Sequence, residues 1–375
     1  MKKLGIYVHI PFCRQKCSYC DFYSVNWNDE SENKYTEAVL NEIKGYRDRL
    51  SGKYTVDTIF LGGGTPTMIR LESLYKIMED LKELIEVNKN SEISMEANPN
   101  TLTFEKLREY REIGINRLSI GVQSLNDDIL KRIGRIHDSR QALESIDRAR
   151  SAGFNNINAD VMFNIPGQEV RDIEETISRL IERDIEHISF YSLKLEKGTP
   201  MYALEKNNKI IMPDEEYERE MYYAGRSLME RSDLLQYEIS NFSKKGFECR
   251  HNLKYWSQDE YIGLGPSAHS FMESVRYSNP ADLKMYCGAG FERTIHESMG
   301  HEDLMFEYIM LRLRLTEGVD IHEFNSRFSE DFIKKYEGQI THLGKNNLIE
   351  LSEGHIKLTE KGMDISNYVF EKFME

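Results

Sequence analysis

The sequence predicts an α/β fold in which helices cover a mainly parallel sheet. For nearly two hundred residues, short apolar and β-branched segments alternate with amphipathic segments, as in repeated β–α units. Six segments begin like strands, at Leu4, Thr55, Ile93, Arg117, Asn156 and His187. Six such units can form an open doubly wound sheet or an incomplete barrel, and hydrophobic periodicity does not choose between them.

The predicted elements of this region follow one another along the chain. Strands are predicted over residues 4–10, 55–61, 93–96, 117–122, 156–162 and 187–195. Helices are predicted over residues 32–50, 71–85, 104–113, 127–133, 140–152 and 170–182. In the second of these helices, the apolar residues recur three or four positions apart, which places them on one face.

The pattern changes after Met212-Pro213-Asp214. A long helix is predicted over 214–232, and an irregular, aromatic and glycine-containing stretch over 237–271. Further helices are predicted over 303–313, 321–328 and 332–343, followed by a hairpin over 348–358 and a last helix capped by Thr359. Helices followed by a hairpin resemble a winged-helix-like α+β module. We therefore expect three regions, at residues 1–210, 211–300 and 301–375.

Charge and composition exclude several classes of protein. The net charge is −14, and the segment from His301 onward has 9 Lys and Arg against 15 Asp and Glu, so we expect no nucleic-acid partner. The N-terminus lacks the features of a signal peptide, and no stretch approaches the ~20 apolar residues of a transmembrane helix. Only 5 cysteines are present, three of them clustered, which predicts reduced thiols and a cytoplasmic protein.

The three clustered cysteines are Cys13, Cys17 and Cys20, spaced C-x3-C-x2-C directly after the first predicted strand. Thiolates at this spacing can hold an iron–sulfur cluster, and three of them leave one iron of a four-iron cluster without a protein ligand. The alternatives are a structural zinc site or coincidence. Structural zinc usually takes two pairs of ligands, whereas Cys249 and Cys287 are remote and isolated.

The segment Tyr7-Val8-His9-Ile10-Pro11-Phe12-Cys13, followed by Cys17 and Tyr19-Cys20, resembles the opening of radical S-adenosylmethionine (SAM) proteins. The similarity is greatest to the branch that contains oxygen-independent coproporphyrinogen III oxidase and the HemW-type haem chaperones. The resemblance implies a partial, laterally open (β/α)6 barrel with a C-terminal winged-helix-like region. It also implies a [4Fe–4S] cluster held by the three cysteines, with SAM chelating the open iron.

Polar and glycine residues follow the ends of several predicted strands, where parallel α/β folds place their sites. Taken singly, each has a plain structural explanation, such as a glycine turn, a solvated carboxylate or arginine, or a helix cap. Their order after the cysteines resembles the SAM-contacting positions of the family. The resemblance implies SAM contacts for Tyr7, Tyr19, Gly63, Gly64, Thr65, Glu96, Gln123, Arg135 and Asp160.

A second cluster of candidate residues is His251-Asn252-Leu253-Lys254-Tyr255-Trp256. A histidine beside aromatic residues suits haem, although it can equally be a hydrogen-bonded histidine in an aromatic core. The pattern H-N-x-x-Y-W resembles the motif of the haem-chaperone branch, which implies haem as a further cofactor and His251 as its axial ligand. Cys249 and His269 are reserve candidates, and His9 is expected to be packed inside or bonded to the backbone.

Two departures distinguish the chain from the oxidase branch. Phe22 occupies the position where the oxidase typically has a further cysteine, and Tyr7 lies too close to the start for a covering N-terminal extension. We therefore expect a haem chaperone that delivers haem to apo-haem proteins, including respiratory ones at the membrane, and we assign no catalytic residue. The alternative is a radical-SAM oxidase that decarboxylates coproporphyrinogen III. A purely structural metal module would leave the strand-end residues without a role.

Overall fold

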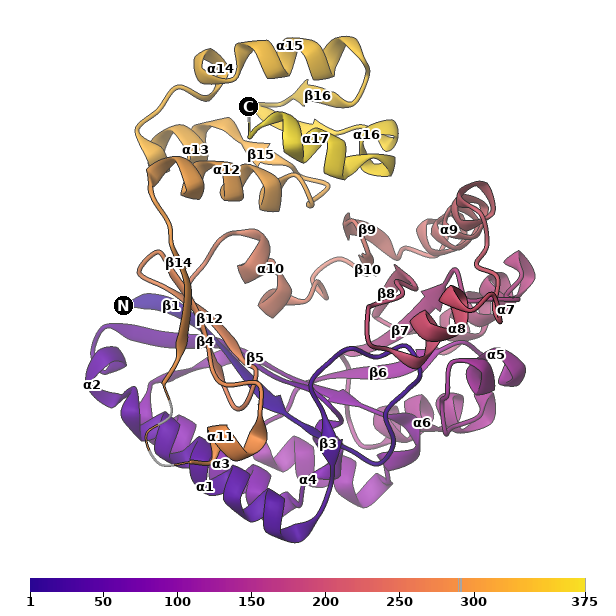
Figure 1. Cartoon of the computed structure of the whole chain (residues 1–375), viewed down its shortest axis with the longest axis vertical. Coiled ribbons are helices and arrows are strands. Elements are labelled where there is room, and N and C mark those ends of the chain that lie inside the picture. The colour runs from indigo at the N-terminus through magenta and orange to yellow at the C-terminus, as the bar shows by residue number, and fades with distance from the viewer. Residues whose placement is uncertain (289, 291, 375) are drawn as a thin grey trace.

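The computed structural model of the chain describes residues 1–288, 290 and 292–374, and its centre is one large, mainly parallel sheet (Figure 1). Six parallel strands form its middle: β1 (Lys2–Ile10), β4 (Tyr54–Gly63), β5 (Val87–Ala97), β6 (Arg117–Gln123), β7 (Ile157–Phe163) and β8 (His187–Ser192). A further strand, β11 (Tyr261–Leu264), pairs with β1 in parallel.

The order of these strands decides between the two folds that the periodicity left open. They are neighbours in the order in which they occur in the chain, from β1 to β8. A doubly wound sheet would instead reverse its order at a switch point. Within the described residues the edge strands β14 and β9 do not pair with each other, so the sheet stays open. The prediction of a partial, laterally open barrel of six β–α units is confirmed.

Helices cover the outer face of the barrel: α1 (Asp29–Gly45), α2 (Arg47–Leu50), α3 (Leu71–Leu84), α4 (Phe104–Ile113), α5 (Asp127–Arg132), α6 (Ser139–Ser151) and α7 (Val170–Ile181). The helix predicted over 32–50 is divided into α1 and α2, which meet at Tyr46. The side chain of Tyr46 is part of the hydrophobic core. The remaining helices of the barrel lie within a few residues of their predicted bounds.

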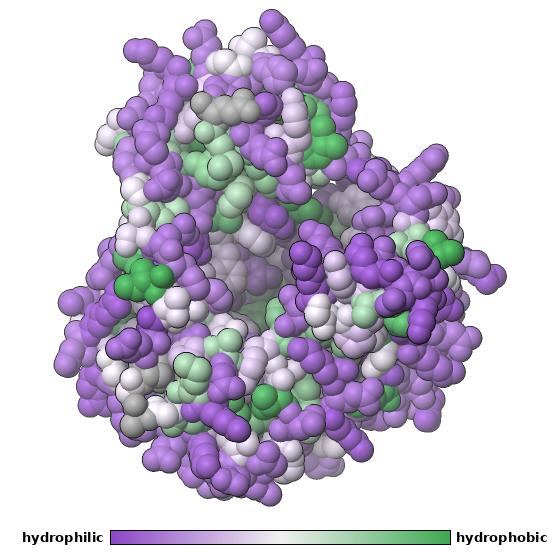
Figure 2. Space-filling model, in the orientation of Figure 1, coloured by the Kyte–Doolittle hydropathy of each residue, from purple (hydrophilic) through white to green (hydrophobic). Residues whose placement is uncertain are grey.

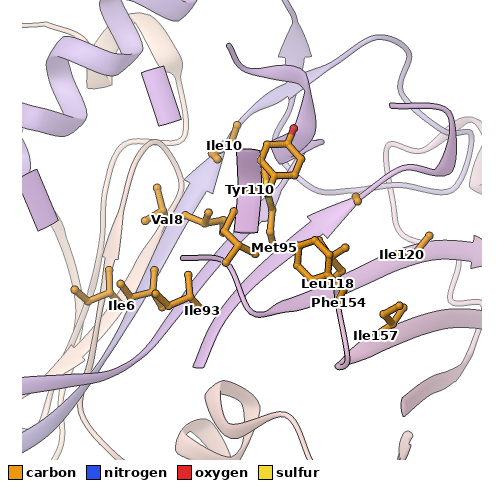
Figure 3. Packing of buried hydrophobic residues seen from close by; sticks show 14 of the residues in the cluster. Ile6, Val8, Ile10, Ile93, Met95, Tyr110, Leu118, Ile120, Phe154 and Ile157 are labelled. Carbon is orange, nitrogen blue, oxygen red and sulfur yellow. The ribbon is translucent and has the colours of Figure 1, made fainter. Parts of the chain in front are cut away.

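Each barrel strand has one apolar and one polar face, because successive side chains of a strand point to opposite sides. In β6, Leu118, Ile120 and Val122 belong to the buried core beneath the helices. Figure 3 shows Leu118 and Ile120 packed there with isoleucines of neighbouring strands. Arg117 and Ser119 alternate with them and line the inner cavity. The interior of the barrel is therefore polar, whereas its outer face forms the hydrophobic core.

The segment after the barrel completes the sheet at both edges. It comprises α8 (Pro200–Lys206), α9 (Glu215–Glu230), β9 (Leu235–Glu238), β10 (Asn241–Ser243), α10 (Arg250–Trp256), β11, β12 (His269–Met272), β13 (Val275–Ser278), α11 (Leu283–Tyr286) and β14 (Thr294–Ser298). The stretch 237–271, expected to be irregular, therefore contains several short elements. These strands have only three or four residues, too few to show a period of two in the sequence.

The C-terminal region has a hydrophobic core of its own, built around Tyr308, Phe324, Phe328 and Phe332. Its elements are α12 (His301–Arg312), β15 (Val319–Asp320), α13 (Ile321–Phe328), α14 (Phe332–Lys335), α15 (Glu337–Lys345), β16 (Ile349–Ser352), β17 (His355–Leu358), α16 (Glu360–Asp364) and α17 (Ser366–Lys372). Strand β15 pairs with β17 of the hairpin β16–β17, so the three strands form a small antiparallel sheet. The α+β character of this region is confirmed, whereas the domain boundaries stay a prediction.

None of the described helices is both long and apolar enough to cross a membrane.

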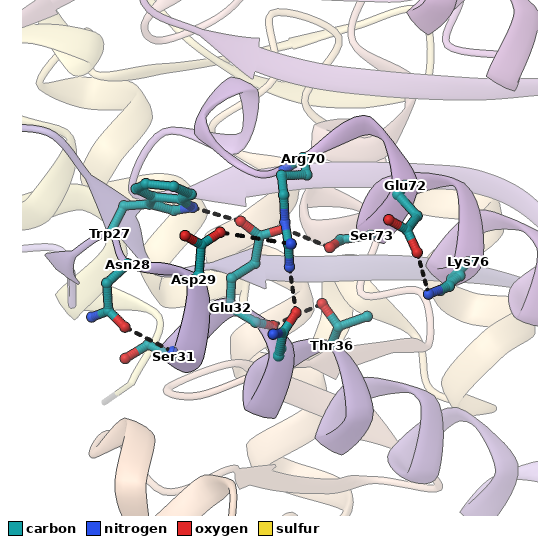
Figure 4. A network of polar contacts seen from close by, with 11 residues as sticks. Trp27, Asn28, Asp29, Ser31, Glu32, Thr36, Arg70, Glu72, Ser73 and Lys76 are labelled. Carbon is teal, nitrogen blue, oxygen red and sulfur yellow. Dashed lines mark hydrogen bonds and ion pairs between the residues drawn. The ribbon is translucent and has the colours of Figure 1, made fainter.

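The buried carboxylate of Glu32 fastens α1 to the segment that enters α3 (Figure 4). It accepts hydrogen bonds from the Trp27 indole at 2.5 Å, the Ser73 hydroxyl at 2.5 Å, and both the backbone and side chain of Arg70 at 3.0 Å. Trp27 directly follows the short strand β3 (Val25–Asn26), which pairs with β2 (Phe12–Cys13) at the first cysteine. This network therefore anchors the chain that leaves the cysteine loop.

We expect Glu32→Ala to lower the free energy of unfolding by roughly 2–4 kcal/mol, because buried donors lose their acceptor. Urea unfolding followed by circular dichroism measures the effect. The control is Glu30→Ala, which removes an exposed ion pair with Lys34 and should leave the midpoint unchanged. Equal effects of the two substitutions would contradict the anchoring role of Glu32.

Candidate functional site

The interior of the barrel contains a cavity of about 710 Å³, within the range of roughly 300–1,000 Å³ that is usual for small-molecule sites. Figure 2 shows the molecule hollowed between the barrel and the C-terminal region. The residues expected to bind the cluster or SAM, and the expected haem ligand, all line this one cavity: Tyr7, Cys13, Cys17, Tyr19, Cys20, Gly63, Gly64, Thr65, Glu96, Gln123, Arg135, Asp160 and His251. Residues far apart in the sequence thus share one space.

The cysteine loop is held from both sides by backbone hydrogen bonds. The N–H of Ser18 donates to the carbonyl of Ile133 at 3.2 Å, and the carbonyl of Ser18 accepts from Met201 at 3.0 Å. Cys17 and Cys20 are joined by a turn, with a 3.3 Å bond from the N–H of Cys20 to the carbonyl of Cys17. The loop therefore presents its thiols at a defined end of the cavity.

The three loop cysteines are free and only partly buried, so their sulfur atoms are available as ligands. Burial raises the pKa of Cys20 to about 11, which means that its thiolate needs a positive partner such as a metal. In the described residues, no three His, Cys, Asp or Glu side chains converge closely enough for one metal ion. An iron–sulfur cluster spreads its ligands over several irons, so three thiols on one loop are compatible with a cluster.

The glycine run after β4 packs directly against the chain that enters the cysteine loop. The N–H groups of Gly64 and Thr65 donate to the carbonyls of Ile10 and Phe12, each at 2.8 Å. A Cβ on Gly64 would lie 2.8 Å from the carbonyl oxygen of Phe12, which leaves no room for a side chain. Thr65 also lies 3.6 Å from the sulfur of Cys13. The glycines thus have a packing role, and their contact with SAM stays a prediction.

Two half-buried carboxyl groups face the cavity from β5 and β7. Glu96 accepts a 3.0 Å hydrogen bond from the N–H of Gly63, and Asp160 accepts from Asn158 at 2.7 Å and from Ser119 at 3.2 Å. Burial, reinforced by the charge of Asp160, raises the pKa of Glu96 to about 8. Burial also raises the pKa of Asp160, against the effect of its hydrogen bonds. A cationic ligand would favour the charged forms of both groups.

Arg135 connects the cysteine loop with the strand ends. Its guanidinium donates to Asn98 at 2.6 Å, to the carbonyl of Gly121 at 2.7 Å and to the sulfur of Cys17 at 3.6 Å. It is therefore not a solvated surface arginine, the simplest explanation of the sequence alone. Asn98 in turn donates to Thr65 at 2.8 Å, which closes a chain of contacts around the cavity wall.

Gln123 ends β6 with a left-handed backbone (φ 66°) and accepts a 3.0 Å hydrogen bond from the hydroxyl of Tyr191. The hydroxyl of Tyr7 donates to Nδ1 of His9 at 3.1 Å. Nε2 of His9 donates to the backbone carbonyl of Tyr23 at 2.9 Å, so this histidine is bonded to the backbone, as expected from the sequence. Burial raises the pKa of both Tyr7 and Tyr19, so their hydroxyls stay protonated donors.

His251 lies near the start of α10, which enters the open side of the barrel (Figure 1). Its Nδ1 is hydrogen bonded to the Thr58 hydroxyl at 2.9 Å and its Nε2 to the Tyr255 hydroxyl at 2.8 Å. Burial lowers the pKa of His251 to about 3, which keeps the imidazole neutral. Ligation of iron through Nε2 therefore requires the Tyr255 hydroxyl to move. The reserve candidates Cys249 and His269 are not among the cavity residues.

Sequence reasoning missed several cavity residues. Asn98 directly follows β5, two residues after Glu96, and Tyr191 lies near the end of β8. Their positions at strand ends are the signal that could have identified them. Arg117 begins β6, at the opposite end of the strand from the expected site. Arg314 comes from the C-terminal region, and nothing in the sequence connects it with the barrel.

The pKa of Glu96 predicts a pH dependence of stability for protein free of cluster and ligands. The folded form keeps a proton that the unfolded chain has released, so stability falls as pH rises from 4.5 toward 8. Between about pH 5.5 and about pH 8.5, we expect wild type to lose about 3 kcal/mol more than Glu96→Gln, which cannot titrate. Denaturant titrations at both pH values measure this difference, and parallel pH profiles would contradict the raised pKa.

Comparison with known proteins places these features in a family. Residues 7–180 match the radical SAM superfamily, and residues 299–365 match the HemN C-terminal domain. The heme chaperone HemW of Bacillus subtilis (strain 168) is 38% identical over 374 residues, covering 98% of each chain. The heme chaperone HemW of Escherichia coli (strain K12) is 30% identical over 382 residues, covering 99% of this chain and 98% of the relative.

The solved structure of coproporphyrinogen III oxidase (HemN) from Escherichia coli, a radical SAM enzyme, has the same fold. It superposes with a TM-score of 0.86 over 99% of this chain and 90% of that chain, at 22% sequence identity. The superfamily implies a [4Fe–4S] cluster and SAM, and the relatives support a function of the HemW type. With curated relatives matched along almost their whole length, the chain belongs to the family of the HemW heme chaperones, within the radical SAM superfamily.

Proposed function

We propose that this protein is a haem chaperone that binds a [4Fe–4S] cluster, SAM and haem, and delivers the haem to apo-haem proteins. The observation that carries the proposal is the shared cavity. One space is lined by the three loop cysteines, by the nine residues expected to contact SAM and by the helix that carries His251. Ligands bound at these positions would be close enough to influence one another.

Cys13, Cys17 and Cys20 would hold the cluster. Their thiols are free, half-buried and on one loop, and the Arg135 guanidinium beside Cys17 would offset part of the negative charge of the thiolates. When bound, the cluster supplies an iron without a protein ligand, to which the amino and carboxylate groups of SAM can bind.

Glu96 and Asp160 would face the positively charged parts of SAM. Both carboxyl groups are held in place by hydrogen bonds from the protein, and burial raises the pKa of each. A bound cation makes it favourable for such groups to release their proton, so the pair is suited to a ligand with an ammonium or sulfonium charge. Gln123 and Asn98 provide further donors and acceptors at the same wall.

The haem would lie against α10. Phe60, Tyr255 and Trp256 give this part of the cavity an aromatic wall, which suits the face of a porphyrin. The imidazole of His251 is neutral, which is the form that ligates iron, and its Nε2 becomes available once the Tyr255 hydroxyl turns away.

The second candidate function is oxidative decarboxylation of coproporphyrinogen III, which the common fold with HemN favours. Against it, Phe22 lines the cavity as a largely exposed side chain (63% exposed) at the position of the oxidase's additional cysteine. Incubation of reconstituted protein with coproporphyrinogen III, SAM and a reductant distinguishes the two. Formation of protoporphyrinogen and 5′-deoxyadenosine would overturn the chaperone proposal.

We expect Cys17→Ser to abolish the cluster, because the loss of one of three cysteine ligands leaves two irons without protein ligands. After anaerobic reconstitution, wild type should hold about four irons per chain, and the variant should hold almost none. Iron analysis and visible absorption measure this. The control is Cys287→Ser, which removes a half-buried free thiol outside the cavity and should keep the full iron content. A variant that retains its cluster would contradict the proposed ligand set.

Haem titration tests the assignment of His251. We expect His251→Ala to weaken haem binding and to change the Soret spectrum. We expect Tyr255→Phe to strengthen binding by about 5-fold, because the Nε2 of His251 no longer has to break a hydrogen bond worth about 1 kcal/mol. Unchanged affinity and spectrum in His251→Ala would exclude this residue as the ligand.

A further inference from the structure

The cavity extends beyond the residues expected from the sequence, to the place where α10, the turn between β9 and β10 and the segment after α12 meet. Trp256, Glu238, Asn241 and Arg314 line this end. Each of them has a buried polar atom without a hydrogen-bond partner: the indole Nε1, one carboxyl oxygen, the amide oxygen and the guanidinium Nε. Buried polar atoms normally have partners, so such a group points to a missing ligand.

Arg314 lies over the indole ring of Trp256, with its guanidinium carbon 4.4 Å from the ring centroid. Among the described residues, its Nε has no hydrogen-bond partner. Burial lowers the pKa of Arg314, whereas the charge of Glu238 acts in the opposite direction. The Arg314 side chain is half-buried at the cavity wall, where a ligand can reach its guanidinium.

The backbone fixes the position of this arginine. The carbonyl of Arg314 accepts from the N–H of Ile239 at 3.1 Å, and the N–H of Thr316 donates to the carbonyl of Tyr237 at 3.1 Å. Between them, Leu315 forms an antiparallel bridge with Glu238. The C-terminal region thus contributes a short pairing segment to the edge of the barrel, and a guanidinium held in this way is preorganised for a ligand.

Glu238 is the carboxyl group that faces Arg314. One of its oxygens accepts from the N–H of Ser240 and from Asn241, while the other has no partner. Burial raises the pKa of Glu238, whereas the hydrogen bond from Ser240 and the charge of Arg314 act in the opposite direction. Of the four unpartnered atoms at this end, the indole Nε1 of Trp256 and the guanidinium Nε of Arg314 are donors. These two donors fit a ligand that carries a carboxylate.

We propose that Arg314 and Trp256 bind the carboxylate-bearing edge of the porphyrin, with the guanidinium paired to a propionate and the indole packed against the ring. This inference rests on the proposed haem-chaperone function. A planar guanidinium matches a carboxylate with two parallel hydrogen bonds, and an aromatic ring beneath it also contacts the apolar part of the ligand. The haem site would then be complete only with the C-terminal region in place.

The test is a set of titrations of the full-length, cluster-loaded protein with haem and with haem dimethyl ester, in which the propionates carry no charge. We expect wild type to bind haem about 10-fold more tightly than the ester, the gain of one charge-assisted pair. Arg314→Gln should weaken haem binding about 10-fold and leave ester binding unchanged. Arg314→Lys, which keeps the charge but not the planar fork, should lie between the two.

Two controls complete the design. Arg111→Gln removes a similar arginine-over-ring contact, 5.3 Å above Phe154 and outside the cavity, and should change neither titration. SAM also carries a carboxylate, so its affinity is measured in the same variants and should be unchanged in Arg314→Gln. Loss of SAM binding there would assign Arg314 to the nucleotide and overturn the inference.

The outcomes separate this inference from the proposed function. Wild type that binds haem and its ester equally, or an Arg314→Gln variant that loses both equally, overturns the role of Arg314 and leaves the chaperone proposal intact. Wild type that binds neither porphyrin overturns the chaperone proposal, and this inference with it. Circular dichroism of Arg314→Gln and Arg314→Lys identifies any loss through misfolding.

Discussion

The site depends on the alternation of side chains along the barrel strands. Because each strand turns its apolar residues outward to the helices, the residues between them must point into the barrel. In this chain many of those inward residues are polar or charged, as Ser119 and Asp160 illustrate, although Phe60 and Met162 also line the cavity. A closed and filled barrel would have to bury these groups against one another, whereas the open barrel leaves a cavity that ligands can enter.

Two fixed attachments hold the walls of this cavity together. At one end, the glycine run after β4 is hydrogen bonded to the backbone that enters the cysteine loop. At the other end, Glu92 of β5 accepts from the N–H groups of Arg250 and His251 and so caps the start of α10. A carboxylate at a helix N-terminus is stabilised by the unpaired N–H groups there. The cysteine loop and the helix with His251 are therefore held by two neighbouring parallel strands, β4 and β5.

Much of this architecture could be predicted from the sequence, because local patterns determine it. The helix α4 has its predicted bounds, since Thr103 caps its start and Gly114 ends it in a left-handed conformation. The strand-end candidates converge because parallel strands bring their carboxyl ends together. The short strands β10 and β11 could not be predicted, because three or four residues carry no period and their pairing is decided by strands distant in the sequence. Neither the hydrogen bond of His251 to Thr58 nor the position of Arg314 over Trp256 could be predicted, because both depend on contacts between regions remote in the sequence.

The central claim of this account is that cluster and haem share one cavity, and electron paramagnetic resonance of the reduced cluster tests it most directly. Under these reducing conditions bound haem is ferrous, and its five-coordinate, high-spin iron is paramagnetic. Bound in the same cavity, it should broaden the cluster signal and speed its relaxation, compared with protein that holds the cluster alone. A diamagnetic zinc porphyrin should leave the signal unchanged. A cluster signal that stays the same when one equivalent of ferrous haem is bound would place the haem elsewhere and contradict the account.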